Sequence, residues 1–597
     1  MKTFGKFAAA SLGLLFVGAP LASCGKNSGG IVTLDVYSQL ANYSGEQVGF
    51  FSTLLEDKFG VRLNIISDAD GTYASRMESG DLGDIVVWAN TGTQYQEAVR
   101  QGLLLDWESE DYLDPDGGSM LDNYGQDIKK YFQLGLESNR QINDEMIGNN
   151  KIYGIGHGLS TDTNSHEAFF YSWDIRWDLY KELGYPEIND LDDYYDLLVA
   201  MKELEPYDDN GNPTYAFSLW SDWDDAMVMY VKSFVSAYYG YDEIGMGLYD
   251  TENDVFHGAL EEGGPYLQML EFFNRLNQAG LIDPNSLTQD YDTMIAKVSN
   301  GGTFASIFNY AGYIAYNTPE HLAEGKMMGT LIPDDARVIV YGMNPYGGDR
   351  VWSIGSTSQY PELAMQIINY LATPEGAMAV WHGLEGVHWR YAEDGGMEYT
   401  EFGKQCINDK STLQNGHTWT SPETGKTYDL SGTFNDGTLQ INNILWSFDA
   451  VNPDPRANGE RFNNEFWTSE QGDSDYEIVQ DWVSYRQKEI DEAYGAGKYT
   501  VRNRQDYLEY RPTQSGEKGY VVIPAVNYAM SSKGDLTTSW NAVITNIKNG
   551  SWQAIMASTS GAYTVAVRNM MTQANGNGYA KCLEWNVSEA ERKFGDK

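Results

Sequence analysis

The first stretch after the N-terminal segment alternates between strand-like and helix-like patterns, and this alternation constrains the fold more than any other feature. Residues 31–37 and 61–65 alternate apolar and polar side chains, which is typical of half-buried strands. Between them apolar side chains recur at helical spacing, and Ser44 followed by Gln47 predicts a capping-box start for that helix. A second helical pattern precedes an apolar strand at residues 85–87. This order predicts an α/β domain with a largely parallel sheet.

The apolar strand ends in two side chains that suit recognition, Trp88 and Asn90. In open α/β sheets, ligands bind beyond the carboxyl ends of the strands. A flat indole face beside an amide suits a sugar ring, because the CH face of the ring stacks and its hydroxyls need hydrogen-bond partners. The alternative is core packing of Trp88, since most tryptophans are largely buried.

Several segments resemble one known family. Residues 84–89, DIVVWA, with the helix after them, resemble the corresponding stretch of the family 1 extracellular solute-binding proteins of ABC importers, which include the maltose-binding type. Residues 149–155 and 385–389 resemble the first and the return crossovers between the lobes of that family. The resemblance covers most of residues 31–389 and the last helices, whereas residues 395–535 match no motif.

This resemblance implies an α/β, two-lobed periplasmic-binding-protein-type fold with three hinge crossovers. It assigns residues 31–155 and 333–385 to the first lobe, and residues 156–332 and 386–597 to the second. A ligand that binds between such lobes stabilises the closed form through its higher affinity for that form.

The N-terminal segment has the pattern of a secretory signal peptide. Basic residues precede an apolar stretch at residues 7–21, which is too short to span a bilayer. Residues 21–24, LASC, resemble a bacterial lipobox, which implies removal of residues 1–23 and a lipid on the Cys24 sulfur. Residues 24–30 would form a lipidated tether. We therefore expect an extracytoplasmic lipoprotein, lipid-anchored to the bacterial cell membrane.

The charge balance is strongly acidic, with 40 Lys and Arg against 85 Asp and Glu and a net charge of −45. Nucleic-acid binding requires a basic surface, so we expect no nucleic-acid partner. The same balance argues weakly against an anionic ligand. Apart from Cys24, only Cys406 and Cys582 are present, and the sequence leaves their pairing open.

The predicted ligand set consists of aromatic side chains near the ends of predicted elements, together with polar neighbours. Aromatic rings stack on sugar faces, and a few polar groups then fix the hydroxyls. For each aromatic residue alone, core packing is the alternative. The set comprises Trp88, Asn90, Trp220, Asp222, Trp223, Asn309, Tyr310 and Trp540, with Arg350 as a weaker polar partner and His388 as a crossover residue.

We expect no cofactor, with one weak exception at a short polar loop. Asp208, Asn210 and Asn212 place oxygen ligands at alternate positions, as a calcium loop begins. Larger members of the resembled family that bind acidic polysaccharides carry calcium near this point. The alternative is a simple turn, because later carboxylates are missing where Ala216 and Phe217 stand and Asn-Gly favours turns.

The sequence predicts a binding protein and not an enzyme, because it carries no nucleophile elbow, phosphate loop or dinucleotide fingerprint. We expect a monomer that captures a carbohydrate, in particular an oligosaccharide, between its lobes and delivers it to the membrane permease of an ABC importer. The alternative is a surface lipoprotein that binds or cleaves glycans without coupling to transport. Both use the same stacking chemistry, so only the crossover motifs favour the importer.

Overall fold

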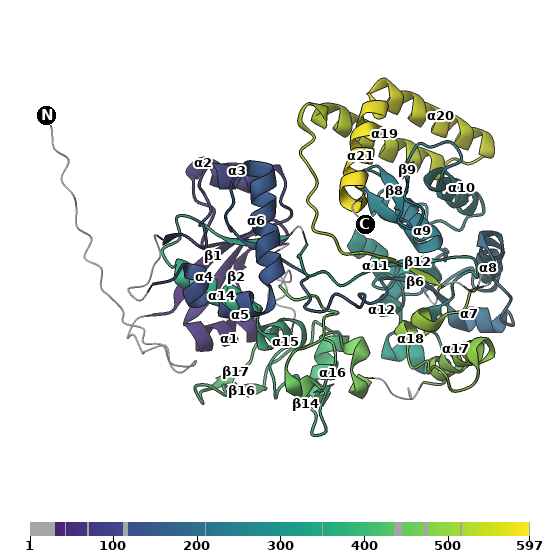
Figure 1. Ribbon diagram of the computed structural model, residues 1–597. Coiled ribbons are helices and arrows are strands. Elements are labelled where there is room, and N and C mark those ends of the chain that lie inside the picture. Colours follow the sequence, from purple (N-terminus) through teal and green to yellow (C-terminus); the bar gives the residue numbers. More distant parts are fainter. Residues whose placement is uncertain are drawn as a thin grey trace.

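The computed structural model describes residues 30–595 except 42, 69–70, 111–116, 209, 349, 435–444, 471–475, 514–515 and 517. Cys24, with its predicted lipid, lies outside the described residues. The chain forms two lobes that lie side by side, and segments far apart in the sequence build each of them (Figure 1).

The first lobe is built on a six-stranded sheet in the order β2-β3-β1-β4-β13-β5. The strand β1 pairs in parallel with both β3 and β4, as the alternating pattern predicts, while β13 runs antiparallel between β4 and β5. The strands are β1 (Val32–Ser38), β2 (Gly45–Glu46), β3 (Val61–Ser67), β4 (Ile85–Trp88), β5 (Ile155–Gly156) and β13 (Val351–Ile354). The main helices around them are α1 (Gly49–Phe59), α2 (Thr72–Ser79), α3 (Thr93–Arg100), α6 (Gln133–Ile147), α14 (Pro361–Leu371) and α15 (Pro374–His382).

The predicted capping box at the start of the first helix is wrong. The helix α1 begins at Gly49, and its N-cap Val48 makes no side-chain capping bond. Residues 45–46 instead form the edge strand β2, which pairs antiparallel with β3. The Ser44 hydroxyl lies 2.7 Å from the Ser67 hydroxyl, so sheet pairing takes the residue that the local pattern assigned to a cap.

The second lobe is built around a three-stranded sheet, β10-β6-β11, and a parallel pair, β12-β18. Its strands are β6 (Tyr171–Arg176), β10 (Ala305–Phe308), β11 (Met328–Thr330), β12 (Val338–Tyr341) and β18 (Tyr520–Ile523). Its main helices are α7 (Trp177–Glu182), α8 (Leu191–Leu204), α9 (Met229–Tyr239), α10 (Pro265–Gln278), α11 (Tyr291–Ser299), α12 (Tyr313–Tyr316), α17 (Glu477–Tyr494), α18 (Arg504–Tyr510), α19 (Thr537–Ile555), α20 (Ser560–Gly576) and α21 (Tyr579–Phe594).

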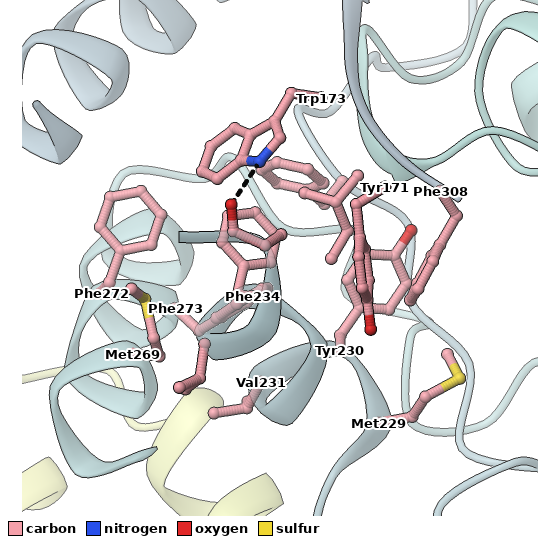
Figure 2. Close-up of a cluster of buried hydrophobic side chains, with 14 of the residues drawn as sticks. Tyr171, Trp173, Met229, Tyr230, Val231, Phe234, Met269, Phe272, Phe273 and Phe308 are labelled. Carbon is pink, nitrogen blue, oxygen red and sulfur yellow. Dashed lines mark hydrogen bonds between the residues drawn. The ribbon is translucent and has the colours of Figure 1, made fainter. Parts of the chain in front are cut away.

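An aromatic core joins β6 to the helices α9 and α10 (Figure 2). The Trp173 indole packs edge-on against Phe234 and donates a 3.0 Å hydrogen bond to the Ala237 carbonyl. Phe234 also packs against Phe273 at 4.9 Å between ring centroids. Residues 215–217 form only isolated parallel bridges, Tyr215 with Thr303 just before β10 and Phe217 with Ile282.

The core clusters divide the chain differently from the predicted lobe boundaries. Residues 386–434 and 445–467 pack into the first lobe, where the Trp446 indole donates a 2.8 Å hydrogen bond to the Ala372 carbonyl. Val338 and Val340, on the predicted first-lobe side of residue 333, lie in the second-lobe core because β12 pairs with β18. The resemblance at residues 385–389 therefore marks a hairpin of the first lobe and not a return crossover.

Three crossovers join the lobes, as the resemblance implies. The first two, near residues 156–168 and 341–350, run alongside each other through backbone hydrogen bonds such as Glu167 N–H to the Tyr341 carbonyl at 2.8 Å. The third lies between Trp467, in the first core, and Ile478, in the second. The first two crossovers, paired in this way, and the third crossover together form the hinge between the lobes.

The two remaining cysteines do not pair. Cys406 is buried in the first-lobe core and Cys582 in the second-lobe core, and both are free thiols. Among the described residues, none of the helices combines the length and the apolar character needed to cross a bilayer.

Candidate ligand-binding site

Several aromatic side chains meet at one edge of the second-lobe sheet. Tyr310 follows the end of β10, and Phe170 precedes β6, which lies antiparallel beside β10. The segment at residues 215–219 forms a parallel bridge, Tyr215 with Thr303, to the residues just before β10, and it leads to Trp223. Tyr291 begins α11. We call Phe170, Trp223, Tyr291 and Tyr310 the aromatic surface.

The rings of the aromatic surface touch one another in a continuous series. Trp223 stacks on Tyr291 at 4.7 Å between centroids with 23° between their planes, and lies 6.0 Å from Tyr310. Tyr310 lies 5.5 Å from Phe170. The Trp223 side chain is 49% exposed and Phe170 is 42% exposed. Clustered exposed aromatic rings of this kind mark interaction sites in soluble proteins.

Two further residues, one of them buried, hold this surface in place. Trp220 is 1% exposed and packs edge-on against Trp223 at 5.2 Å, so it supports the surface from below. Asn309 accepts a 2.7 Å hydrogen bond from the Tyr310 N–H, and its own N–H donates to the Phe170 carbonyl. Burial raises the pKa of Tyr310, which keeps its phenol neutral and able to donate a hydrogen bond.

The loop that carries Trp223 supplies two carboxylates. Asp222 is exposed beside Trp223, as expected for a group that fixes hydroxyls. Asp224 instead accepts a 2.7 Å hydrogen bond from the Trp552 indole of α19. This bond ties the loop of Trp223 to the C-terminal helices.

On the first lobe, the predicted site residues Trp88 and Asn90 have different environments. Trp88 is fully buried in the first-lobe core, where it packs edge-on against Tyr95 at 5.8 Å. Asn90 is exposed, and its side-chain oxygen accepts a 2.9 Å hydrogen bond from the Gly92 N–H ahead of α3. The structure thus places Trp88 in the core, the alternative named for it, and leaves Asn90 exposed.

The remaining predicted polar residues lie away from the aromatic surface. His388 is fully buried in the first lobe, where Nδ1 accepts from the Leu384 N–H and Nε2 lies 3.1 Å from Gln414 Oε1. Burial lowers the pKa of His388 to about 4, so it stays neutral. Arg350 is exposed on the second crossover, and its carbonyl accepts from the His157 N–H.

Trp540 lies near the start of α19, apart from the aromatic surface. It is 6% exposed and packs edge-on against Trp585 at 5.1 Å. The Lys533 ammonium lies 4.8 Å from the centre of the Trp540 ring and 5.0 Å from that of Trp585. Trp540, Trp585 and Lys533 therefore form a second aromatic cluster on the second lobe.

The loop that begins at Asp208 is closed by its own hydrogen bonds. Asp208 Oδ1 accepts from the N–H groups of Asn210 and Asn212, and Oδ2 accepts from the Asn212 side chain at 3.1 Å. These bonds use the oxygens that calcium would need. No cluster of three or more His, Cys, Asp or Glu suited to a metal ion occurs in the described part of the chain.

Sequence reasoning missed Phe170 and Tyr291. Phe169 and Phe170 both precede β6, and because neighbouring side chains of an extended segment point to opposite sides, Phe169 is buried while Phe170 is exposed. Tyr291 follows Asp290, whose side chain caps α11 by accepting from the Thr293 N–H. The helix-cap signal was readable, but only the fold brings this helix start to Trp223.

Comparison with known proteins places the chain in a family. Residues 53–387 match the sequence profile of the bacterial extracellular solute-binding proteins. No curated protein sequence matches the chain. The alginate-binding protein AlgQ2, solved without calcium ion, has a TM-score of 0.58 and 15% identity over 94% of this chain and 99% of its own.

Two further solved structures have the same fold. An HMO-binding solute-binding protein associated with an ABC transporter, from Bifidobacterium longum infantis, has a TM-score of 0.53 and 11% identity over 94% of this chain and 99% of its own. An EF-hand mutant of FusA, an ABC-transporter substrate-binding protein of S. pneumoniae, solved with fructo-nystose, has a TM-score of 0.52 and 14% identity over 95% and 100%. The predicted two-lobed α/β fold is thereby confirmed. The family match covers more than half of the sequence, and the chain belongs to the bacterial extracellular solute-binding proteins.

Proposed function

We propose that the protein is the substrate-binding component of an ABC importer, and that it captures an oligosaccharide on the aromatic surface of its second lobe and delivers it to a membrane permease. The observation that carries this proposal is the continuous contact of Phe170, Tyr310, Trp223 and Tyr291 at one sheet edge. Two of these residues, Trp223 and Phe170, are 49% and 42% exposed.

The chemistry of this surface suits sugars. Aromatic faces stack on the CH faces of pyranose rings, while exposed groups such as Asp222 and the neutral Tyr310 phenol bond to hydroxyls. The surface presents several rings in a row, which favours a ligand of more than one sugar unit. Structural neighbours described as binding alginate, HMO and fructo-nystose support a carbohydrate of this size.

Cellular placement follows from the same proposal. The family is extracellular, and the N-terminal pattern ending at Cys24 supports anchoring through a lipid on that sulfur. We propose that the anchored protein acts as a monomer beside its permease. Mass spectrometry of the membrane-extracted protein, with a Cys24→Ala variant as control, tests the anchor.

Calcium at the loop around Asp208 is a separate proposal. The carboxylate and amide oxygens of this loop favour calcium binding. The hydrogen bonds that Asp208 already accepts oppose calcium binding. A rise in melting temperature with calcium chloride that disappears in Asp208→Ala would support a bound ion. An unchanged melting temperature would refute one.

The experiment that tests the function is calorimetry and thermal shift of the chain from residue 25 with a panel of mono- and oligosaccharides. A ligand that binds only the folded state raises the melting temperature with its concentration. We expect Trp223→Ala to abolish binding of the recognised glycan. Tyr360→Ala, which truncates a 45% exposed ring on the first lobe, is the matched control and leaves binding unchanged.

The recovered glycan distinguishes the alternatives. Chromatography after incubation shows an unchanged glycan if the protein only binds. Shortened products would favour a glycan-cleaving lipoprotein, and the absence of binding across the panel would contradict carbohydrate recognition altogether.

A further inference from the structure

The ammonium group of Lys533 lies between two indoles. It is 4.8 Å from the ring centre of Trp540 and 5.0 Å from that of Trp585. The two indoles meet at 78° and form two walls of a corner around the charge. Lys533 is half-buried, so one side of the corner stays open.

Within the described part of the chain, no carboxylate lies within ion-pair distance of Lys533. Its hydrogen-bond acceptor is the Met530 sulfur, at 3.8 Å, which is a weak acceptor. Burial lowers the pKa of Lys533, while the more distant charges of Asp225 and Glu589 act in the opposite direction.

One wall of the corner, Trp540, lies on α19, the helix that also supports the aromatic surface. Trp552 of α19 bonds to Asp224, next to Trp223, and Lys548 donates to the Asp224 carbonyl. Trp540 lies twelve residues before Trp552, which corresponds to about 18 Å along the helix axis. This separation fits a chain of several sugar units.

The segment that carries Lys533 also faces the first lobe. In Figure 1, the chain between β18 and α19 runs along the side of the second lobe that faces α6. Asn527 of this segment accepts a 2.7 Å hydrogen bond from Ser138 and donates one to Gln141, both on α6. A ligand held between the lobes therefore has access to the segment that carries Lys533.

We propose that Lys533, framed by Trp540 and Trp585, binds the carboxylate of an acidic sugar unit, such as a hexuronate, in the oligosaccharide whose other units stack on the aromatic surface. This inference rests on the proposed function and deepens it. The indoles exclude water and strengthen the attraction between ammonium and carboxylate. The overall charge of −45 does not prevent it, because exposed charges beyond about 8 Å are screened at physiological ionic strength.

The test uses calorimetry with tri- to pentasaccharides of galacturonate, mannuronate and glucuronate-substituted xylose, each beside a neutral oligosaccharide of equal length. We expect the protein to prefer an acidic member of a pair. Lys533→Gln is expected to weaken that binding about tenfold, since a hydrogen bond between charged groups is lost. It is expected to change binding of the neutral partner by less than twofold.

Two variants and a salt titration control the result. Lys533→Arg keeps the charge and is expected to retain most of the preference for acidic oligosaccharides. Lys498→Gln removes a lysine that lies over the rings of Tyr494 and Tyr499, away from the corner, and is expected to leave binding of both oligosaccharides unchanged. Added salt is expected to weaken binding of the acidic oligosaccharides by the unaltered protein. Because this measurement changes no residue, misfolding of a variant cannot cause the result.

The outcomes separate this inference from the proposed function. Neutral glycans that bind as well as their acidic partners, with Lys533→Gln indistinguishable from the unaltered protein, would overturn the acidic subsite and leave the sugar-binding function in place. No binding of any glycan would overturn both.

Discussion

At the residue scale, two tryptophans that the sequence treats alike have opposite environments. Trp88 is fully buried in the first lobe, whereas Trp223 is 49% exposed on the second. Local sequence does not separate them, because both follow apolar segments and precede helices. Only the packing around each indole decides whether it stabilises the fold or faces a ligand.

Stability measurements should distinguish these two roles. We expect Trp88→Ala to lower the free energy of unfolding by about 3–5 kcal/mol, because it leaves a cavity in a closed core. Trp223→Ala should cost less than about 1 kcal/mol while it removes ligand binding. Urea unfolding followed by circular dichroism checks both variants. Equal losses of stability would contradict the assignment of Trp223 to a surface.

A second residue-scale prediction concerns the hinge carboxyl of Glu167. Burial, with a further contribution from the nearby charge of Asp449, raises the pKa of Glu167 to about 8. The folded state therefore holds a proton that the unfolded chain releases near pH 4.5, and the stability from this group is lost as pH rises toward 8. Asp449 is held by the Asn463 side chain and the Ala168 N–H, and Arg461 lies near it.

We expect Glu167→Gln to raise the melting temperature at pH 8–9 and to change it little at pH 5, because the glutamine has no proton to lose. Thermal unfolding between pH 5 and pH 9 measures the effect, with the exposed Glu362→Gln on the first lobe as control. The same pH slope in the variant and the unaltered protein would show that Glu167 does not titrate in the hinge.

At the element scale, one side chain links the segment before the third crossover to the elements behind the aromatic surface. Glu465 accepts hydrogen bonds from the Tyr313 hydroxyl of α12 and from Gln505 of α18, the latter at 2.7 Å. Gln505 in turn accepts from the Phe169 N–H, directly before Phe170. Hydrogen bonds therefore connect the segment before the third crossover to the backbone that presents the surface.

Loss of this link should loosen a defined part of the second lobe. We expect Glu465→Ala to increase amide hydrogen exchange in α12 and α18 and around Phe169, because the Tyr313 hydroxyl and the Gln505 amide lose their acceptor. Exchange in α14 of the first lobe is the internal control. Unchanged exchange in α12 and α18 would show that the link carries no stability.

At the scale of the whole molecule, the chain is a solute-binding protein and not an enzyme, as the sequence predicts. Two lobes with separate cores are joined by crossovers whose paired backbones allow a small rotation to move whole lobes. A ligand held by both lobes shifts this equilibrium toward closure.

Small-angle scattering should detect that closure. We expect the radius of gyration to fall when a recognised oligosaccharide saturates the protein, because bound ligand favours the closed arrangement. Trp223→Ala at the same glycan concentration should keep the radius of the free protein. A constant radius on saturation with bound glycan would contradict closure of the lobes around it.

The sequence by itself determined the elements and the family. Period-two patterns located β1 and β3, an apolar run located β4, and helical spacing located the helices between these strands. Such features depend on side chains close together in the chain, so they can be read locally. The resemblance to the extracellular solute-binding proteins correctly predicted the two-lobed fold with three crossovers.

Only the tertiary structure decided which lobe each later segment joins and which aromatic rings are exposed. Residues 386–434 and 445–467 pack into the first lobe through contacts such as Trp446 with Ala372, and Ser44 pairs with Ser67 instead of capping α1. Phe170, Trp223, Tyr291 and Tyr310 come together only because strands from distant parts of the chain end at one sheet edge. Burial depends on all the segments that surround a side chain, and no local pattern contains that information.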